Sequence, residues 1–345
     1  MHVQTEVPLA DYTSLRLGGP AARLLEADIE DDVIAAVQEA DRDREDLLVL
    51  GGGSNIVVGD IGFPATVVRV GTRGVRVESD QCAGAFVRVQ AGEDWEALVA
   101  RAVDEGWVGV EALSGIPGLV GATPIQNVGA YGQEVADTIA QVRTWDRVLS
   151  RFATFATGDC GFGYRTSMFK RAPARWVVLE VTFQFLQGEL SPPIRYAELA
   201  RTLGVGIGDR APTKEVREAV LDLRRGKGMV LDPQDPDTRS AGSFFMNPVL
   251  PARQADALPK DAPRFPVADS MVKTSAAWLI EQAGFTRGHG GPRARISSKH
   301  TLALTTRDGA TTNDLLTLAR EVRSGVVDRF GIELQPEPVL VQCAL

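Results

Sequence analysis

The sequence of 345 residues contains little cysteine, little histidine and no excess of positive charge. Neither CxxC nor CxxH spacing occurs among its three cysteines, which argues against a zinc site or a disulfide framework; they are Cys82, Cys160 and Cys343. The three histidines are too dispersed to suggest a metal site; they are His2, His289 and His300. A net charge of −8 argues against a general nucleic-acid-binding protein. We therefore expect no metal ion and no nucleic-acid partner.

Long apolar runs are absent as well. No run approaches the ~18 residues that a membrane-spanning helix needs. The N-terminal segment MHVQTEVPLADYTSLRLGG has no basic start followed by an apolar stretch, so it does not resemble a secretion signal. Hydrophobic residues make up 44% and charged residues 24%, values that are typical of a soluble globular protein. We expect a cytoplasmic protein with no membrane association.

The chain length predicts two or three domains. Hydrophobic periodicity predicts helices over 30–42, after Asp94, from Thr213, from Ser275 and near Asn313. Strands are expected at 47–53, 66–70, 86–90, 179–185 and 338–345, whereas 187–212 is loop-rich and indicates a boundary. Because the elements do not follow a regular βαβ order, the pattern predicts an α+β fold.

The first notable loop is GGGSNIVVG at 51–59, which follows an expected strand. A dinucleotide-binding GxGxxG motif is excluded because Ile56 stands at the third glycine position and a strand-like segment follows instead of a helix. The segment predicts a strand, a turn and a second strand. Backbone N–H groups in such a turn can bind an anion such as a pyrophosphate. A plain hairpin turn is the simpler interpretation of this loop taken alone.

The second loop is SGIPGLVGATPIQNVGAYG at 114–132, which carries no charge and five glycines. Glycines let the main chain approach a flat ligand where a side chain would collide. Its apolar residues indicate burial, and uncharged donors and acceptors lie among them: Ser114, Thr123, Gln126, Asn127 and Tyr131. This combination suits the ring and pyrophosphate of a cofactor, while a glycine-rich surface loop is the alternative.

Three further motifs follow in order: GYRTSMFK at 163–170, SAGSFFMNP at 240–248 and QPEP at 335–338. Together with the two loops, they resemble the UDP-N-acetylenolpyruvoylglucosamine reductase family over essentially the whole chain, in its longer, tyrosine-bearing type. The resemblance implies a two-part FAD-binding domain of the vanillyl-alcohol-oxidase type and a separate α+β substrate domain. The expected ranges are 1–75 and 76–212 for the FAD-binding parts, 213–332 for the substrate domain and 333–345 for a returning C-terminal strand.

The resemblance implies non-covalent FAD held by both loops. In the first loop the expected contacts are Gly51, Gly52, Gly53, Ser54, Asn55 and Ile56. In and after the second loop they are Ser114, Gly115, Ile116, Pro117, Gly118, Gly121, Thr123, Gln126, Asn127, Gly129, Ala130, Tyr131 and Arg165. The absence of histidine and cysteine from both loops argues against covalent attachment.

The implied reaction reduces an enolpyruvyl ether to a lactyl ether with NADPH, by way of FAD, in peptidoglycan precursor synthesis. Negative charge develops beside a carboxylate, so the site needs a fixed cation and a proton donor. By resemblance these are Arg165 and Ser243, with Glu337 near the reacting double bond. Residue by residue, the alternatives are a surface ion pair for Arg165, a turn or helix cap for Ser243 and an exposed loop position for Glu337.

For the sugar-nucleotide diphosphate, the resemblance implies Tyr196, Arg224, Lys227 and Asn247. Met246 departs from relatives that carry lysine there, and a solvated basic helix end is the alternative interpretation of Arg224 and Lys227. We expect a UDP-sugar and NADPH as the small-molecule partners, no metal and no obligate protein partner. Two other functions are weighed: another FAD-dependent oxidoreductase of the same fold, and a flavin- or nucleotide-binding module without catalysis.

Overall fold

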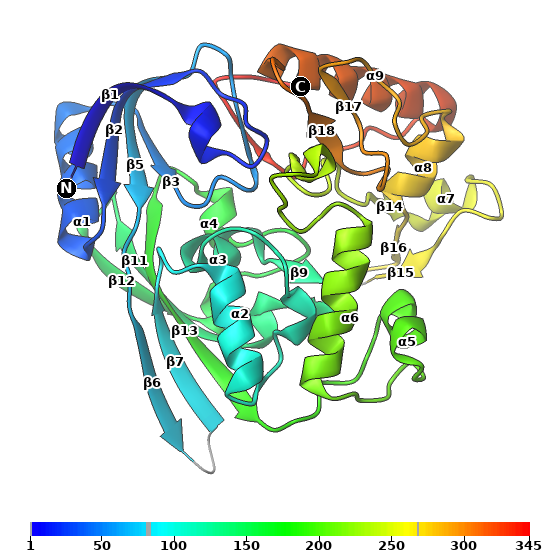
Figure 1. The fold of residues 1–345 in the computed structure, drawn as a ribbon, viewed down its shortest axis with the longest axis horizontal. Helices are drawn as coiled ribbons and strands as arrows, with labels where there is room; N and C mark the ends of the chain where they lie inside the picture. The colour runs from blue at the N-terminus through cyan, green and yellow to red at the C-terminus, as the bar shows by residue number, and fades with distance from the viewer. Residues whose placement is uncertain (1, 81–83, 268) are drawn as a thin grey trace. The chain divides into compact units, whose positions relative to one another are not determined.

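The computed structural model describes residues 2–80, 84–267 and 269–345, so Cys82 lies outside the described residues (Figure 1). The chain forms two compact units. The first comprises Met1–Val7, Ala21–Gly52 and Pro64–Arg225, and the second comprises Pro8–Pro20, Gly53–Phe63 and Gly226–Leu345. Among the described residues, no helix has the length and apolar character needed to cross a membrane. The four domain ranges predicted from the sequence stay a prediction.

The first unit opens with a four-stranded sheet in the order β1 (His2–Pro8), β2 (Pro20–Ala27), β5 (Phe63–Val70) and β3 (Leu47–Leu50). Strands β3 and β5 are parallel. Helix α1 (Glu30–Asp43) confirms the helix predicted over 30–42, and Val33, Ile34 and Val37 are buried on its inner face, as the spacing of these residues predicts. Figure 1 shows this helix against the sheet.

A larger antiparallel sheet follows in the same unit. Its order is β12 (Arg151–Ala156), β11 (Ile139–Asp146), β13 (Trp176–Gln187), β7 (Gly84–Gln90) and β6 (Val75–Asp80), and the short β8 (Trp107–Val108) pairs with the end of β13. Helix α2 (Trp95–Asp104) packs on it through the fully buried Trp95, whose ring lies 5.9 Å from that of Phe183. The Asp94 carboxylate accepts a hydrogen bond from the Ala97 N–H at 2.8 Å, so Asp94 caps the helix that is predicted to start after it.

Helix α1 also contacts the second sheet. Leu179 of β13 and Trp145 of β11 belong to the same buried cluster as Val37 of this helix. Arg143 of β11 donates two hydrogen bonds, of 2.6 and 2.5 Å, to the Glu30 carboxylate at the start of the helix. A two-pronged arginine–carboxylate pair fixes direction as well as distance, so it orients α1 on the second sheet.

Two helices complete the first unit. Helix α5 (Ala197–Leu203) lies inside the segment that the sequence analysis describes only as loop-rich, and helix α6 (Thr213–Gly226) starts at Thr213 as predicted. Helix α5 forms because the fully buried Leu199 packs in one cluster with Val216 and Val220 of α6. This contact is tertiary, and short-range periodicity does not reveal it.

In the described part of the second unit, the strands form three small sheets. They are β14 (Val249–Pro251), β16 (Met271–Lys273) and β15 (Phe265–Pro266) in that order, β17 (Ala294–Ile296) with β18 (Leu304–Thr306), and β19 (Val339–Val341) with β4 (Ile56–Val58). The described helices are α7 (Ala252–Asp256), α8 (Ala276–Gln282) and α9 (Thr312–Phe330). The N-cap residues of α8 and α9 are Ser275 and Thr311, which agree with the predicted starts of these two helices. The closing strand is confirmed but shorter than predicted.

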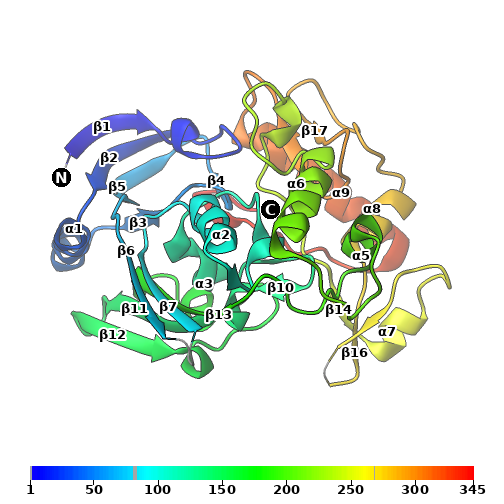
Figure 2. The same cartoon turned by 60° about the horizontal axis from the view of Figure 1, so that its bottom comes forward.

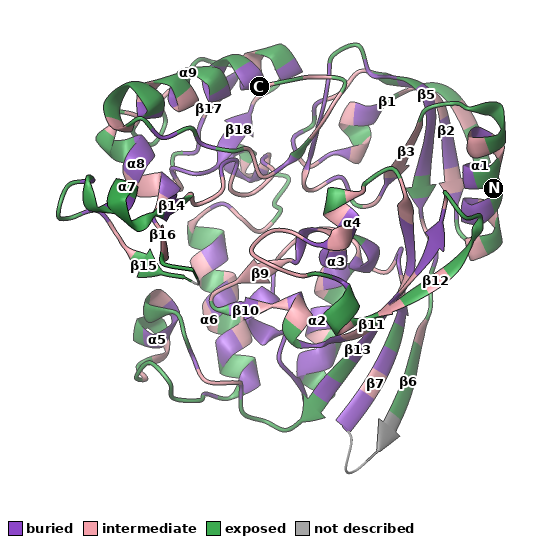
Figure 3. Cartoon of the chain, turned by 180° about the vertical axis from the view of Figure 1, so that it is seen from behind, coloured by how far each residue is buried: buried purple, intermediate pink, exposed green. Residues whose placement is uncertain are grey.

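The core of the second unit contains side chains from all three of its separate chain segments. Leu15 and Val57 lie in one buried cluster with Phe244, Leu279 and Val322. Figure 3 shows the buried inner side of α9 and the exposed outer side. The two aromatic residues of the SAGSFFMNP motif are among the most buried, at 1% exposed each for Phe244 and Phe245. Their burial holds the flanking motif residues in place.

Candidate active site

The GGGSN loop lies between β3 and β4, so the predicted strand, turn and strand are confirmed. The hairpin alternative is wrong, because β3 pairs with β5 whereas β4 pairs in parallel with β19. The glycines permit close main-chain packing. A Cβ on Gly52 would lie 2.8 Å from the Cα of Gly118, and one on Gly53 would lie 1.8 Å from the carbonyl oxygen of Tyr12.

The second loop is built from short turns. It passes through a 3₁₀ turn (Val120–Ala122), helix α3 (Thr123–Gln126) and a small hairpin of β9 (Gly129–Ala130) and β10 (Gln133–Glu134). The two residues at the hairpin tip, Tyr131 and Gly132, both have positive φ, of 50° and 88°. This is the backbone of a type I′ turn, in which an aromatic residue is unusual. Tyr131 therefore occupies a strained position that the surrounding contacts must hold.

The loop fits a flat cofactor. Gly115 and Gly118 have φ of +73° and +125°, which residues with side chains rarely adopt. The apolar side chains of Ile116, Ile125 and Val128 pack against the sheet core but remain only half-buried. The prediction of a buried loop is therefore right for Val120 and only partly right for these three. A half-buried, uncharged, apolar strip beside the half-buried Gly118 is a surface that an isoalloxazine ring can cover.

Close packing also fixes the loop on the sheet. A Cβ on Gly121 would lie 2.5 Å from the Cβ of Ala91, the residue directly after β7, and the Gly121 N–H donates to the Ala91 carbonyl at 2.9 Å. Any side chain at this glycine would push the loop away from the sheet. The loop position thus depends on this glycine through contacts inside the protein.

Arg165 lies at a tight turn in which Gly163 and Thr166 exchange two main-chain hydrogen bonds. Its φ is +53°, another left-handed position for a residue with a side chain. The guanidinium donates to the carbonyl oxygens of Asn127 at 3.4 Å and Gly129 at 2.5 Å. The expected charge-bearing residue is thus attached to the second loop.

Two predicted cofactor residues support this turn. The amide nitrogen of Asn127 donates to the carbonyl of Gly163 at 3.0 Å and to the Glu134 carboxylate at 2.9 Å. The ammonium of Lys170, in the short α4 (Met168–Arg171), donates to the Gln126 side chain at 2.7 Å and to the carbonyl of Arg165 at 3.2 Å. Lys170 belongs to the GYRTSMFK motif, and this membership is the sequence signal that points to its role at the turn.

In the second unit, Ser243 and Glu337 lie on adjacent extended segments. Ser243 forms an isolated bridge with Ala303, and Phe245 forms one with Pro336. The Glu337 N–H donates to the Phe244 carbonyl at 2.8 Å. Both candidate residues are half-buried. The segment containing Ser243 therefore runs between two others, and one of these carries Glu337.

The four expected substrate residues are divided between the units. In the first unit the Tyr196 ring meets that of Tyr131 edge-on at 5.3 Å, and burial raises the pKa of both phenols, to about 12 for Tyr131. Arg224 is only 8% exposed, and burial lowers its pKa. In the second unit, Lys227 follows α6 and is half-buried.

Asn247, also in the second unit, supports the start of helix α8. Its side-chain oxygen accepts a hydrogen bond from the Ala276 N–H at 2.9 Å, at the first residue of that helix. This leaves the amide NH₂ as the polar end of Asn247 that can serve a ligand. Arg165 belongs to the first unit and Ser243 and Glu337 to the second, so their convergence on one substrate stays a prediction.

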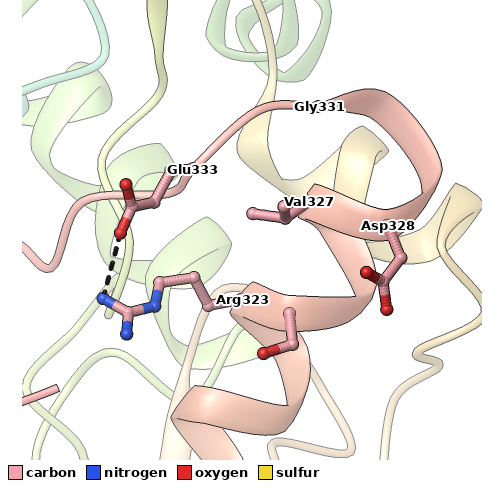
Figure 4. A pocket seen from close by; sticks show the side chains of 6 residues that line it. Arg323, Val327, Asp328, Gly331 and Glu333 are labelled. Carbon is pink, nitrogen blue, oxygen red and sulfur yellow. Dashed lines mark ion pairs between the residues drawn. The ribbon is translucent and has the colours of Figure 1, made fainter.

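Two surface hollows of the second unit contain none of the candidate residues. One, of about 460 Å³, lies at the end of α9, where Arg323 and Glu333 form an ion pair of 3.4 Å (Figure 4). The other, of about 760 Å³, lies where the loop around His289 meets α9. Opposite charges pair within both, and neither resembles the expected site. Among the described residues, no group of acidic, histidine or cysteine side chains could hold a metal ion.

Comparison with known proteins first defines the class. Residues 21–149 match the model of an FAD binding domain, and residues 233–341 match that of the UDP-N-acetylenolpyruvoylglucosamine reductase C-terminal domain. The fold and the loops thus define an FAD-dependent oxidoreductase with a vanillyl-alcohol-oxidase-type cofactor domain and a separate C-terminal domain.

Full-length relatives define the family. The chain is 56% identical to UDP-N-acetylenolpyruvoylglucosamine reductase of Thermobifida fusca over 349 residues, and the match covers 98% of both chains. It is 55% identical to the reductase of Salinispora arenicola over 354 residues, and this match covers 100% of this chain and 97% of the relative. The crystal structure of the Thermus caldophilus reductase superposes with a TM-score of 0.68 at 25% identity, covering 99% of this chain and 100% of that one. The chain belongs to the UDP-N-acetylenolpyruvoylglucosamine reductase family, whose members act in peptidoglycan precursor synthesis with FAD and NADPH.

Proposed function

We propose that Arg165, Ser243 and Glu337 carry the reduction of UDP-N-acetylenolpyruvoylglucosamine to UDP-N-acetylmuramate in this chain. The observation that carries the proposal is the hydrogen bond from the Glu337 N–H to the Phe244 carbonyl, which puts the segments of Glu337 and Ser243 side by side. The proposed reaction is that of the family to which the chain belongs. The role proposed for each residue comes from its position in a motif that resembles the family's.

The loops at 51–56 and 114–131 are proposed to hold FAD. When bound, FAD supplies a hydride carrier between NADPH and the terminal carbon of the enolpyruvyl double bond. The role of the protein is to present main chain without a side chain at the half-buried Gly118, beside an apolar strip formed by Ile116, Ile125 and Val128. Neither loop contains cysteine or histidine, so the proposed attachment is non-covalent.

Arg165 is proposed to stabilise the charge that develops on the substrate carboxylate. A guanidinium stays ionised and can grip a carboxylate with two parallel hydrogen bonds. Its own turn, closed by Gly163 and Thr166, and its bonds to the carbonyls of Asn127 and Gly129 restrict its orientation. Preorganised charge of this kind lowers a barrier because no group must reorient during the reaction.

Ser243 is proposed to donate a proton to the carbon next to the carboxylate. The Oγ–H bond breaks as the new C–H bond forms, and the product is the neutral carbon centre of the lactyl ether. A serine is a weak acid, so the transfer needs nearby groups that stabilise the hydroxyl oxygen as its proton leaves. We assign this support to Glu337 on the adjacent segment, whose carboxyl group would donate a proton to the serine oxygen as the serine proton leaves, so that no alkoxide remains and Glu337 is later reprotonated from solvent.

Tyr196, Arg224, Lys227 and Asn247 are proposed to bind the UDP-sugar. Lys227 offers a point charge for phosphate, Tyr196 a ring and a hydroxyl, and Asn247 the NH₂ group that its contact with Ala276 leaves available. We further propose that the chain works in the cytoplasm, since its two small-molecule partners, NADPH and a nucleotide sugar, are cytoplasmic metabolites, and that it needs no protein partner.

The test follows the colour of the protein. Purified protein should be yellow, and NADPH should bleach it in the absence of oxygen. Addition of UDP-N-acetylenolpyruvoylglucosamine should then restore the colour and yield one UDP-N-acetylmuramate for each NADPH oxidised. Bleaching without recovery on this substrate would point to another flavin oxidoreductase of the same fold, and a colourless protein after gentle purification would point to a module without catalysis.

A further inference from the structure

The first two residues of the flavin loop are held by side chains that carry no assigned role. Glu96 lies in the first turn of α2, and Arg217 lies in the first half of α6. Figures 1 and 2 show these two helices near each other in the first unit. Both residues are partly buried, with side chains 32% and 20% exposed respectively.

The contacts form a closed ring. One carboxylate oxygen of Glu96 accepts from the Gly115 N–H at 2.5 Å, and the other accepts from Arg217 at 2.5 Å. Arg217 donates a second hydrogen bond to the Ser114 hydroxyl at 2.9 Å, and that hydroxyl donates to the Glu111 carbonyl at 2.7 Å. Ser114 is fully buried. Both carboxylate oxygens of Glu96, two guanidinium nitrogens of Arg217 and the Ser114 hydroxyl therefore help to fix where the loop begins.

The ring differs from a second ion pair within helix α6. Arg225 pairs with Asp222 one turn away, and both side chains are well exposed, at 59% and 75%. Such a pair contributes little to stability or position. The pair of Arg217 with Glu96 joins residues 121 positions apart and adds two contacts to the loop. Arg225 therefore provides a matched control on the same helix.

We infer that Glu96 and Arg217 are positioning residues that hold Ser114 and Gly115 in the conformation that FAD requires. The inference rests on the proposed function, because it takes residues 114–131 as the flavin loop. With Gly115 fixed, the half-buried stretch from Ile116 to Leu119 starts at a defined point and in a defined direction. A loop ordered before binding loses less conformational entropy when the ligand arrives, so affinity rises.

The effect should appear in FAD affinity. Hydrogen bonds to charged groups are stronger than those between neutral groups, and about 1.4 kcal/mol corresponds to a tenfold change in a dissociation constant. Because the ring is partly exposed, we expect Arg217→Met to raise the Kd for FAD about tenfold. The variant Arg225→Met should stay within about twofold of the wild type.

The experiment titrates apoprotein with FAD and follows the quenching of flavin fluorescence, and urea unfolding of the same apoproteins serves as a second measurement. The variants are Arg217→Met, Glu96→Gln, the double variant and Arg225→Met. We expect the double variant to resemble the Arg217 variant, since each single change opens the same ring. Should Arg217→Met fail to fold, Arg217→Lys replaces it, because a lysine keeps the charge but cannot contact Glu96 and Ser114 with two separate nitrogens.

Three results would overturn the inference. The first is that the Arg217 variant binds FAD as tightly as the Arg225 variant. The second is that the loss of FAD affinity in the double variant equals the sum of the losses in the two single variants. The third is that the loss of FAD affinity only follows the fraction of apoprotein that is unfolded. A wild-type apoprotein that does not bind FAD would instead refute the proposed function, so the two failures are distinguishable.

Discussion

The main-chain N–H of Glu337 donates a hydrogen bond of 2.8 Å to the carbonyl oxygen of Phe244, the residue directly after Ser243. Two motifs that are far apart in the sequence are thereby paired as neighbouring extended segments. The fully packed Phe244 and Phe245 side chains, each 1% exposed, fix one of these segments in the core of the second unit. Pro336 and Pro338 restrict the backbone on either side of Glu337.

Replacing Glu337 by glutamine should slow the substrate half of the reaction. The amide keeps the size and the hydrogen-bonding capacity of the carboxyl group but cannot exchange a proton. We expect the return of the flavin colour on adding the enolpyruvyl substrate to slow by roughly 10²-fold, with bleaching by NADPH unchanged. Glu333→Gln is the control, because Glu333 is exposed and pairs only with Arg323 at 3.4 Å among the contacts recorded for it. Equal rates for the two variants would remove Glu337 from the mechanism.

A methyl group at Gly121 should displace the flavin loop. A Cβ there would lie 2.5 Å from the Cβ of Ala91, so the Gly121→Ala variant must move the main chain. We expect a loss of about 1–3 kcal/mol in the free energy of unfolding and less FAD per purified chain. Gly158→Ala is the matched control, because a Cβ at Gly158 meets no atom within 4 Å. Unfolding in urea and the visible spectrum measure both effects, and equal behaviour of the two variants would refute this account of the loop.

Stability of the second unit should depend on pH through Asp237, which is only 3% exposed. Burial raises the pKa of this carboxyl, but hydrogen bonds from Ser298, Ser297 and Arg307 outweigh burial and hold the pKa below its usual value. Because the folded pKa is depressed, the stabilisation is present above the unfolded pKa of about 3.9 and is lost as the pH falls through the folded value.

Asp237→Asn should therefore lower the free energy of unfolding by about 3 kcal/mol at neutral pH, and the difference from the wild type should narrow below about pH 4. Asp222→Asn is the control, because Asp222 is 75% exposed and should change stability little. Urea unfolding at several pH values measures the difference. A gap that stays constant down to the lowest pH would contradict the assignment.

Much of the fold could be predicted from the spacing of apolar residues and from helix caps, which are features of neighbouring residues in the sequence. Helices α1, α2, α6 and α9 were predictable because each has a cap or an apolar face at helical spacing. Strands β1 and β12 were not predicted, since both are edge strands whose residues are mostly exposed, so that the alternation of buried and exposed positions is weak. Helix α5 was missed because tertiary contact with α6 stabilises it.

The candidate site was predictable only where residues lie in motifs. Ser243, Glu337 and Arg165 lie in recognisable sequences, but the ring of Glu96 and Arg217 joins positions 121 residues apart and leaves no local signal. The amide of Asn127 illustrates a subtler limit. It lies in the loop that is proposed to hold FAD, yet its hydrogen bonds to Gly163 and Glu134 support the turn that carries Arg165. Sequence position alone does not distinguish a ligand contact from such support.

The central claim is that Ser243 protonates the substrate and takes no part in the oxidation of NADPH. The most direct measurement is anaerobic stopped-flow absorbance of the flavin in the Ser243→Ala variant. Bleaching of the flavin by NADPH and recovery of its colour on adding the enolpyruvyl substrate are recorded separately. The control is Ser324→Ala, which changes an exposed serine of α9. We predict bleaching at the wild-type rate and recovery slowed by about 10²- to 10⁴-fold. Recovery at the wild-type rate, or equal slowing of both steps, would contradict the claim.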